Sequence, residues 1–61
     1  MPIVRVEMWP GRTKEQRAQL AKGITDVFVN VSKTPPDAVI VLFQEVPKDH
    51  WAKAGKLTSE S

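Results

Sequence analysis

Residues 38–46 read AVIVLFQEV, and this stretch decides the fold of the chain. Its apolar residues do not alternate with polar ones until Gln44, which predicts a strand that is buried on both faces. Such burial is typical of a strand in a parallel pair. Because parallel neighbours need a long crossover connection, usually a helix, we expect a helix and a partner strand earlier in the sequence.

The helix is predicted between residue 13 and residue 32 or 33. Thr13 and Gln16 form a capping-box pattern, in which a hydroxyl and an amide satisfy backbone donors at a helix start. The prolines at 35 and 36 cannot continue a helix, so it should end just before them. Its apolar side chains recur every three or four residues along one face, and they are Leu20, Ala21, Ile24, Val27, Phe28 and Val31. The side chains expected in solvent are Lys14, Arg17, Lys22 and Asp26.

The partner strand is predicted over residues 2–8, where apolar and polar positions alternate. One face carries Pro2, Val4, Val6 and Met8, and the other carries Ile3, Arg5 and Glu7. The order is therefore β-α-β, in the α+β class. One helix covers only one face of a two-stranded sheet, so the other face and the sheet edges need a partner. This pattern favours self-association.

The remaining tail, residues 47–61, reads PKDHWAKAGKLTSES. It predicts a turn at residues 47–50 and a short C-terminal hairpin around Gly55 and Lys56, and we expect the last four residues to be frayed. No linker or composition shift divides the sequence, so residues 1–61 are expected to form a single domain.

Length and composition exclude several classes of protein. A chain of 61 residues buries too little surface to be stable comfortably alone. It has no cysteine and one histidine, which excludes disulfides, thiolate nucleophiles and cysteine-based zinc sites, and leaves no metal cluster. Oligomerisation is then the expected source of stability.

Charge and hydropathy point away from nucleic acid and from membranes. The net charge is only +2, with both signs interspersed, whereas nucleic-acid-binding proteins cluster their basic residues. No signal peptide is visible, and the longest apolar run is far shorter than a membrane span. We expect a soluble cytoplasmic protein.

Two residues near the start are candidates for chemistry, although each also has an ordinary explanation. If Met1 is removed, the nitrogen of Pro2 becomes a secondary amine that can act as a base, yet a proline is also common at a strand start. Arg12 precedes the helix cap, where it and nearby backbone donors can hold a carboxylate. Most exposed loop arginines bind nothing. Other candidates are more often structural, with Trp51 as packing, His50 as a surface residue, and Glu7 and Glu45 as strand-face charges.

The joint arrangement resembles the 4-oxalocrotonate tautomerase family along essentially the whole chain. The motifs are MPI running into a strand, GRT followed by EQ at the helix start, PP before an apolar strand, and KDHWAKAG near the end. Each motif is weak alone, but their order and spacing are specific. The resemblance implies β-α-β chains that form homo-oligomers, usually hexamers built as trimers of dimers. It also implies keto–enol tautomerisation of 2-oxo acids and their 2-hydroxydienoate forms without metal or cofactor.

The resemblance also assigns roles to three residues. Pro2 becomes the catalytic base after Met1 is removed, since an α-amino group has an ordinary pKa of roughly 8, close to what a general base requires. Arg12 matches an arginine that binds a substrate carboxylate, commonly in a neighbouring subunit. Trp51 matches an aromatic residue that closes the pocket and keeps it apolar.

Three further positions of the implied site are unusual. Ile40 stands where well-studied members carry a second arginine, which interacts with the 2-oxo and carboxylate end of the substrate. Trp9 and Ala38 fall near positions that line the pocket. The site is therefore expected to be bulkier and less polar, and to handle a monocarboxylate or an arylpyruvate enol at least as well as 2-hydroxymuconate.

Two rival interpretations remain open. In one, Pro2 acts in a hydratase or dehalogenase of the same superfamily, although no convincing polar groups for activating water are present. In the other, the chain is a non-catalytic assembly or binding subunit in which Pro2 only begins a strand.

Overall fold

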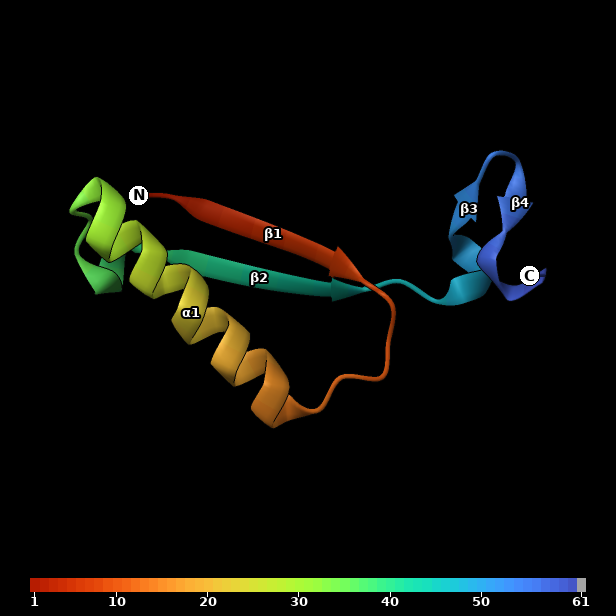
Figure 1. The fold of residues 1–61 in the computed structure, drawn as a ribbon, viewed down its shortest axis with the longest axis horizontal. Coiled ribbons are helices and arrows are strands. Elements are labelled where there is room, and N and C mark those ends of the chain that lie inside the picture. The colour runs from red at the N-terminus through yellow and green to blue at the C-terminus, as the bar shows by residue number, and fades with distance from the viewer. Residues whose placement is uncertain (61) are drawn as a thin grey trace.

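The computed structural model describes residues 1–60 and shows a β-α-β unit followed by a small hairpin (Figure 1). Strands β1 (Ile3–Met8) and β2 (Ile40–Glu45) pair in parallel, and helix α1 (Lys14–Ser32) connects them. The register places Ile3 opposite Ile40 and Met8 opposite Glu45. The predicted α+β class and its crossover are confirmed.

Local signals fix both ends of α1 as predicted. The backbone N–H of Gln16 donates to Thr13 Oγ1 at 3.1 Å, and the Thr13 N–H donates to Gln16 Oε1 at 2.9 Å, which completes the capping box. At the other end Lys33 adopts a left-handed conformation with φ 57°, and its N–H donates to the Phe28 carbonyl. Within residues 1–60, no helix is long and apolar enough to cross a membrane.

The sheet has one covered face and one open face. Along β1, Val4 and Val6 are half-buried and Met8 is 8% exposed, whereas Ile3 on the other face is 60% exposed. This confirms the predicted alternation. The expected burial of both faces of β2 is not found within one chain, because α1 covers a single face and Leu42 remains exposed.

Only part of the predicted helix stripe faces the sheet. Ala21, Ile24 and Phe28 are half-buried, but Val27 and Val31 are 59% and 75% exposed. A two-stranded sheet is narrow, so it covers a narrower band of the helix than the stripe provides. Arg17, expected in solvent, is instead half-buried against the sheet end.

The tail forms the predicted hairpin. After a 3₁₀ turn (η2, Lys48–His50), strands β3 (Ala52–Lys53) and β4 (Lys56–Leu57) pair antiparallel around two residues with positive φ, Ala54 at 54° and Gly55 at 80°. The expectation of four frayed final residues is wrong for three of them. They form a 3₁₀ turn (η3, Thr58–Glu60), which is anchored by a 2.8 Å hydrogen bond from the Thr58 N–H to the Trp51 carbonyl. Ser61 lies outside the described residues.

The single chain is elongated and has almost no core. Its extents are 43 × 24 × 14 Å and its radius of gyration is 14.6 Å. A compact domain of this length would have a radius of gyration of about 10.5 Å. The hairpin lies beyond the end of the sheet (Figure 1), and among residues 1–60 only Met8 is a buried hydrophobic residue. The shape is that of a subunit rather than of a self-sufficient domain.

Candidate active site

Three of the predicted site residues gather at the start of the sheet. Pro2 directly precedes β1, and its carbonyl accepts a 3.0 Å hydrogen bond from the backbone N–H of Ile40. Ala38 ends a 3₁₀ turn (η1, Pro36–Ala38) two residues before Ile40, at the same end of the sheet. All three are half-buried. The pairing of β1 with β2 therefore holds Pro2 beside apolar side chains.

The two tryptophans meet at the opposite end of the sheet. Parallel strands finish at the same edge, so the segments leaving β1 and β2 lie together there. The rings of Trp9 and Trp51 pack edge to face with centroids 5.7 Å apart at 72°, a favoured aromatic geometry. The ammonium of Lys48 lies 5.0 Å from the centroid of the Trp9 ring, a cation–π contact on that ring. The Trp9 ring therefore contacts both Trp51 and Lys48.

Arg12 lies next to this aromatic pair, at the start of α1. Its Nη1 donates to the Trp9 carbonyl at 3.5 Å, and its side chain lines a hollow of about 340 Å³ together with Gln16, Gln19 and Leu20. The free donors of the first helical turn add a partial positive charge at this end. Positive charge is therefore concentrated at this end of α1.

Arg17 ties the loop that carries Arg12 to the sheet. Its Nη1 donates to the Arg12 carbonyl at 2.9 Å and lies 3.5 Å from Glu45 Oε2, at the end of β2. The sequence gives no signal for this contact, because it joins residues 28 positions apart.

The structure thus divides the predicted site into two groups. Pro2, Ala38 and Ile40 lie at one end of β1, and Trp9, Arg12 and Trp51 lie at the other. Six strand residues separate them, a span of about 20 Å. Within one chain, Pro2 does not meet Arg12.

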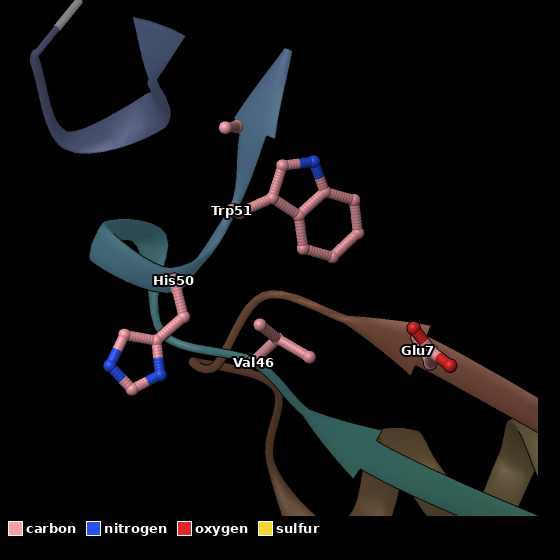
Figure 2. Close-up of a pocket in the computed structure, with 5 residues that line it drawn as sticks. Glu7, Val46, His50 and Trp51 are labelled. Carbon is pink, nitrogen blue, oxygen red and sulfur yellow. The ribbon is translucent and has the colours of Figure 1, made fainter. Parts of the chain in front are cut away.

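A further hollow of about 230 Å³ places Glu7 and His50 near Trp51 (Figure 2). The imidazole of His50 points away from Glu7, with Val46 between them in the view. No hydrogen bond joins Glu7 and His50 in the described part of the chain. They do not form an acid–base pair, which agrees with their interpretation as surface residues.

Among residues 1–60, no three carboxylate or imidazole side chains lie close enough together to hold a metal ion. The pKa of Lys22 is raised above its ordinary value of 10.5, because its ammonium donates a 2.9 Å hydrogen bond to Asp26 and is attracted by that carboxylate. This pair lies on the exposed surface of α1 and belongs to neither group of site residues.

Comparisons with known proteins identify the family of the chain. The family model described as "Tautomerase enzyme" matches residues 2–60. The 2-hydroxymuconate tautomerase of Bacillus subtilis is 37% identical over 60 residues, which covers 98% of this chain and 97% of that protein. The crystal structure of YwhB, a homologue of 4-oxalocrotonate tautomerase, is similar with a TM-score of 0.93 at 35% identity over 98% of both chains.

A second similar structure is a heterohexamer. It is a 4-oxalocrotonate tautomerase from Chloroflexus aurantiacus, with a TM-score of 0.90 at 33% identity over 98% of this chain and 97% of that one. The family model matches nearly the whole sequence, and the relatives are similar over nearly the whole chain. The chain therefore belongs to the tautomerase family.

Proposed function

We propose that the chain is a cofactor-independent keto–enol tautomerase that uses the amine of Pro2 as both base and acid. The observation that carries the proposal is the division of the site into two groups at opposite ends of β1, in a chain that lacks a core. Each group has contacts of its own, and each lacks the residues that the other supplies. A second copy that docks end to end would unite them.

Self-association follows from the same geometry. The open sheet face and the outer side of α1 leave apolar side chains in solvent, among them Ile3, Leu20, Val27 and Val31. Burial of such surface in a homo-oligomer would provide the core that one chain lacks. We propose a hexamer built as a trimer of dimers, and the heterohexameric relative from Chloroflexus aurantiacus supports this number of subunits.

The proposed reaction needs only one proton carrier. After removal of Met1, the Pro2 nitrogen takes the proton of the 2-hydroxyl group, and the O–H electron pair becomes the new carbonyl bond. The carbon–carbon double bonds shift by one position, and the terminal carbon of the conjugated system takes a proton from the Pro2 ammonium. The amine is regenerated, so the reaction consumes nothing.

The other residues bind and orient the substrate. The guanidinium of Arg12, contributed by a neighbouring copy, would hold the carboxylate in a charge-assisted bidentate pair. The indoles of Trp9 and Trp51 would cover the conjugated chain or ring and exclude water. Ile40 offers no hydrogen bond to a second carboxylate, so we propose that arylpyruvate enols are converted at least as well as 2-hydroxymuconate.

The decisive experiment compares the protein with its Pro2→Ala variant. Ketonisation of 2-hydroxymuconate and of phenylenolpyruvate is followed by ultraviolet absorbance, after intact mass has shown that Met1 is absent from both proteins. We expect the variant to lose at least about a hundredfold in kcat/KM, the scale of general acid–base catalysis. Circular dichroism and sedimentation should match between the two.

Equal rates in the two proteins, or none above buffer, would contradict the proposal. Halide release from a 3-haloacrylate would then identify the hydratase or dehalogenase interpretation, and its absence would favour a non-catalytic subunit.

A further inference from the structure

The outer edge of β1 is free to pair with another strand. Its sheet has only two strands, β1 and β2, and among residues 1–60 no element lies alongside the other edge of β1 (Figure 1). The carbonyls of Pro2 and Met8 accept hydrogen bonds from backbone N–H groups on the β2 side. Backbone groups alternate in direction along a strand, so those of Ile3, Arg5 and Glu7 point to the free edge. Such an edge is a template for a further strand.

Two opposite charges stand on one face of this edge strand. Arg5 and Glu7 are two residues apart, so their side chains point to the same face of the sheet, the one that α1 leaves open. Both residues are exposed, and neither has an ion-pair partner within residues 1–60. Val6 lies between them and is half-buried on the covered face. The strand thus presents one positive and one negative charge, placed symmetrically about Val6.

Antiparallel pairing of β1 with β1 of a second copy makes these charges complementary. When the two Val6 residues lie opposite each other, Arg5 of each copy lies opposite Glu7 of the partner subunit. Residues directly opposite in an antiparallel pair have Cβ atoms about 5 Å apart, within reach of an ion pair. Both residues direct their backbone groups to the shared edge, so they also exchange backbone hydrogen bonds. A two-fold axis at Val6 therefore gives two charge pairs.

The neighbouring registers are unfavourable. A slip of one residue turns the backbone groups of one strand away from the other and exchanges the faces of its side chains. A slip of two residues keeps the backbone bonds, but it places Arg5 opposite Arg5 of the partner subunit, or Glu7 opposite Glu7 of the partner subunit. Like charges directly opposite each other are destabilising. Strand β2 has no such pair, because Glu45 is its only charged residue.

We propose that Arg5 and Glu7 form a recognition pair by which this chain selects a second copy of itself at the β1 edge. The inference rests on the proposed self-association, and it adds the contacting strand, the register and the residues that decide which chains pair. The start of one β1 then lies beside the end of the other, with Ile3 opposite Trp9 of the partner subunit. A related chain without opposite charges at these two positions pairs less well, so the charges favour a homo-oligomer over a mixed one.

Charge reversal tests the recognition pair without any assay of activity. Arg5→Glu and Glu7→Arg each place like charges opposite each other in the homo-oligomer. Each variant alone should therefore self-associate about tenfold more weakly than the wild type, or worse, as measured by sedimentation over a range of protein concentrations.

The two variants should complement each other when mixed, because one then supplies two acids along the edge and the other two bases. They are dissociated, reassembled together in equal amounts and examined by native mass spectrometry, which separates them by mass. We expect assemblies with equal numbers of the two variants well above the share that random assembly gives.

A double variant guards against simple unfolding of the single ones. Arg5→Glu with Glu7→Arg restores opposite charges in exchanged positions, so it should self-associate as the wild type does. It should not mix with the wild type, because each of its charges then meets a like charge. The two have the same mass, so the wild type is labelled with heavy nitrogen for this mixture. As the matched control, Lys22→Asp and Asp26→Lys reverse an exposed pair on α1 and should assemble together at random.

A random composition in the mixture of Arg5→Glu and Glu7→Arg would overturn the proposal, and so would free mixing of the double variant with the wild type. A wild type that sediments as a monomer would refute the proposed self-association and this pairing with it. Sorting by charge in a protein without ketonisation activity would refute only the tautomerase proposal. Activity in an oligomer that assembles regardless of these charges would refute only the recognition pair.

Discussion

At the scale of single residues, Ile40 sets the expected preference among substrates. Its backbone fixes Pro2 through a 3.0 Å hydrogen bond, while its side chain adds only apolar surface. Replacement by arginine would place a guanidinium beside the proposed base, where it can bind a second carboxylate or a developing enolate oxygen. The preference is then open to a direct test.

We predict that Ile40→Arg raises kcat/KM for 2-hydroxymuconate relative to phenylenolpyruvate by about tenfold or more. Steady-state ultraviolet assays on both substrates give this ratio. Ile40→Met is the matched control, because methionine is long and unbranched like arginine but carries no charge. If arginine and methionine change the ratio alike, the effect comes from shape, and the electrostatic explanation is wrong.

At the scale of elements, Arg17 connects the loop between β1 and α1 to the end of β2. It donates to the Arg12 carbonyl and pairs with Glu45. A partly exposed ion pair of this kind contributes about 0.2–1 kcal/mol to stability. Arg17 should have a larger effect on the position of Arg12, because the loop that it restrains carries this arginine, which is proposed to bind the substrate carboxylate.

We predict that Arg17→Met raises KM several-fold with a smaller change in kcat, because Arg12 binds the substrate less well when its loop moves. Glu45→Gln removes only the ion pair and keeps the hydrogen bond to the Arg12 carbonyl, so its effect on KM should be smaller. Arg17→Lys should restore part of the loss. A fall in melting temperature that tracks KM across the three variants would point to stability instead.

The elements themselves could be predicted from sequence because their signals are local. The capping box at Thr13 and the prolines at 35 and 36 delimit α1, and the apolar run after residue 38 identifies β2. The contact between Arg17 and Glu45 could not be predicted, because it depends on how the loop packs against the sheet end.

At the scale of the whole molecule, the sequence does not predict how far apart the candidate site residues lie. The order of motifs places Pro2 and Arg12 in one family pattern, yet Pro2 precedes β1 and Arg12 lies beyond its other end, with a strand about 20 Å long between them. Joining them takes a neighbouring copy, and the sequence of one chain does not show where that copy docks. The single chain leaves large apolar side chains exposed, which is consistent with such docking.

Mixing of two inactive variants tests this shared site. Pro2→Ala keeps Arg12, and Arg12→Ala keeps Pro2, so each homo-oligomer lacks one essential group in every site. If both are dissociated and reassembled together in equal amounts, about one quarter of the sites should receive Pro2 from one copy and Arg12 from another. We therefore predict that ketonisation recovers to about a quarter of the wild-type rate, with sedimentation showing the same oligomer before and after mixing. Mixing without dissociation should restore nothing. If both groups came from the same chain, every site would keep a defect and the reassembled mixture would stay inactive, so a lack of recovery in correctly sized oligomers would refute the shared site.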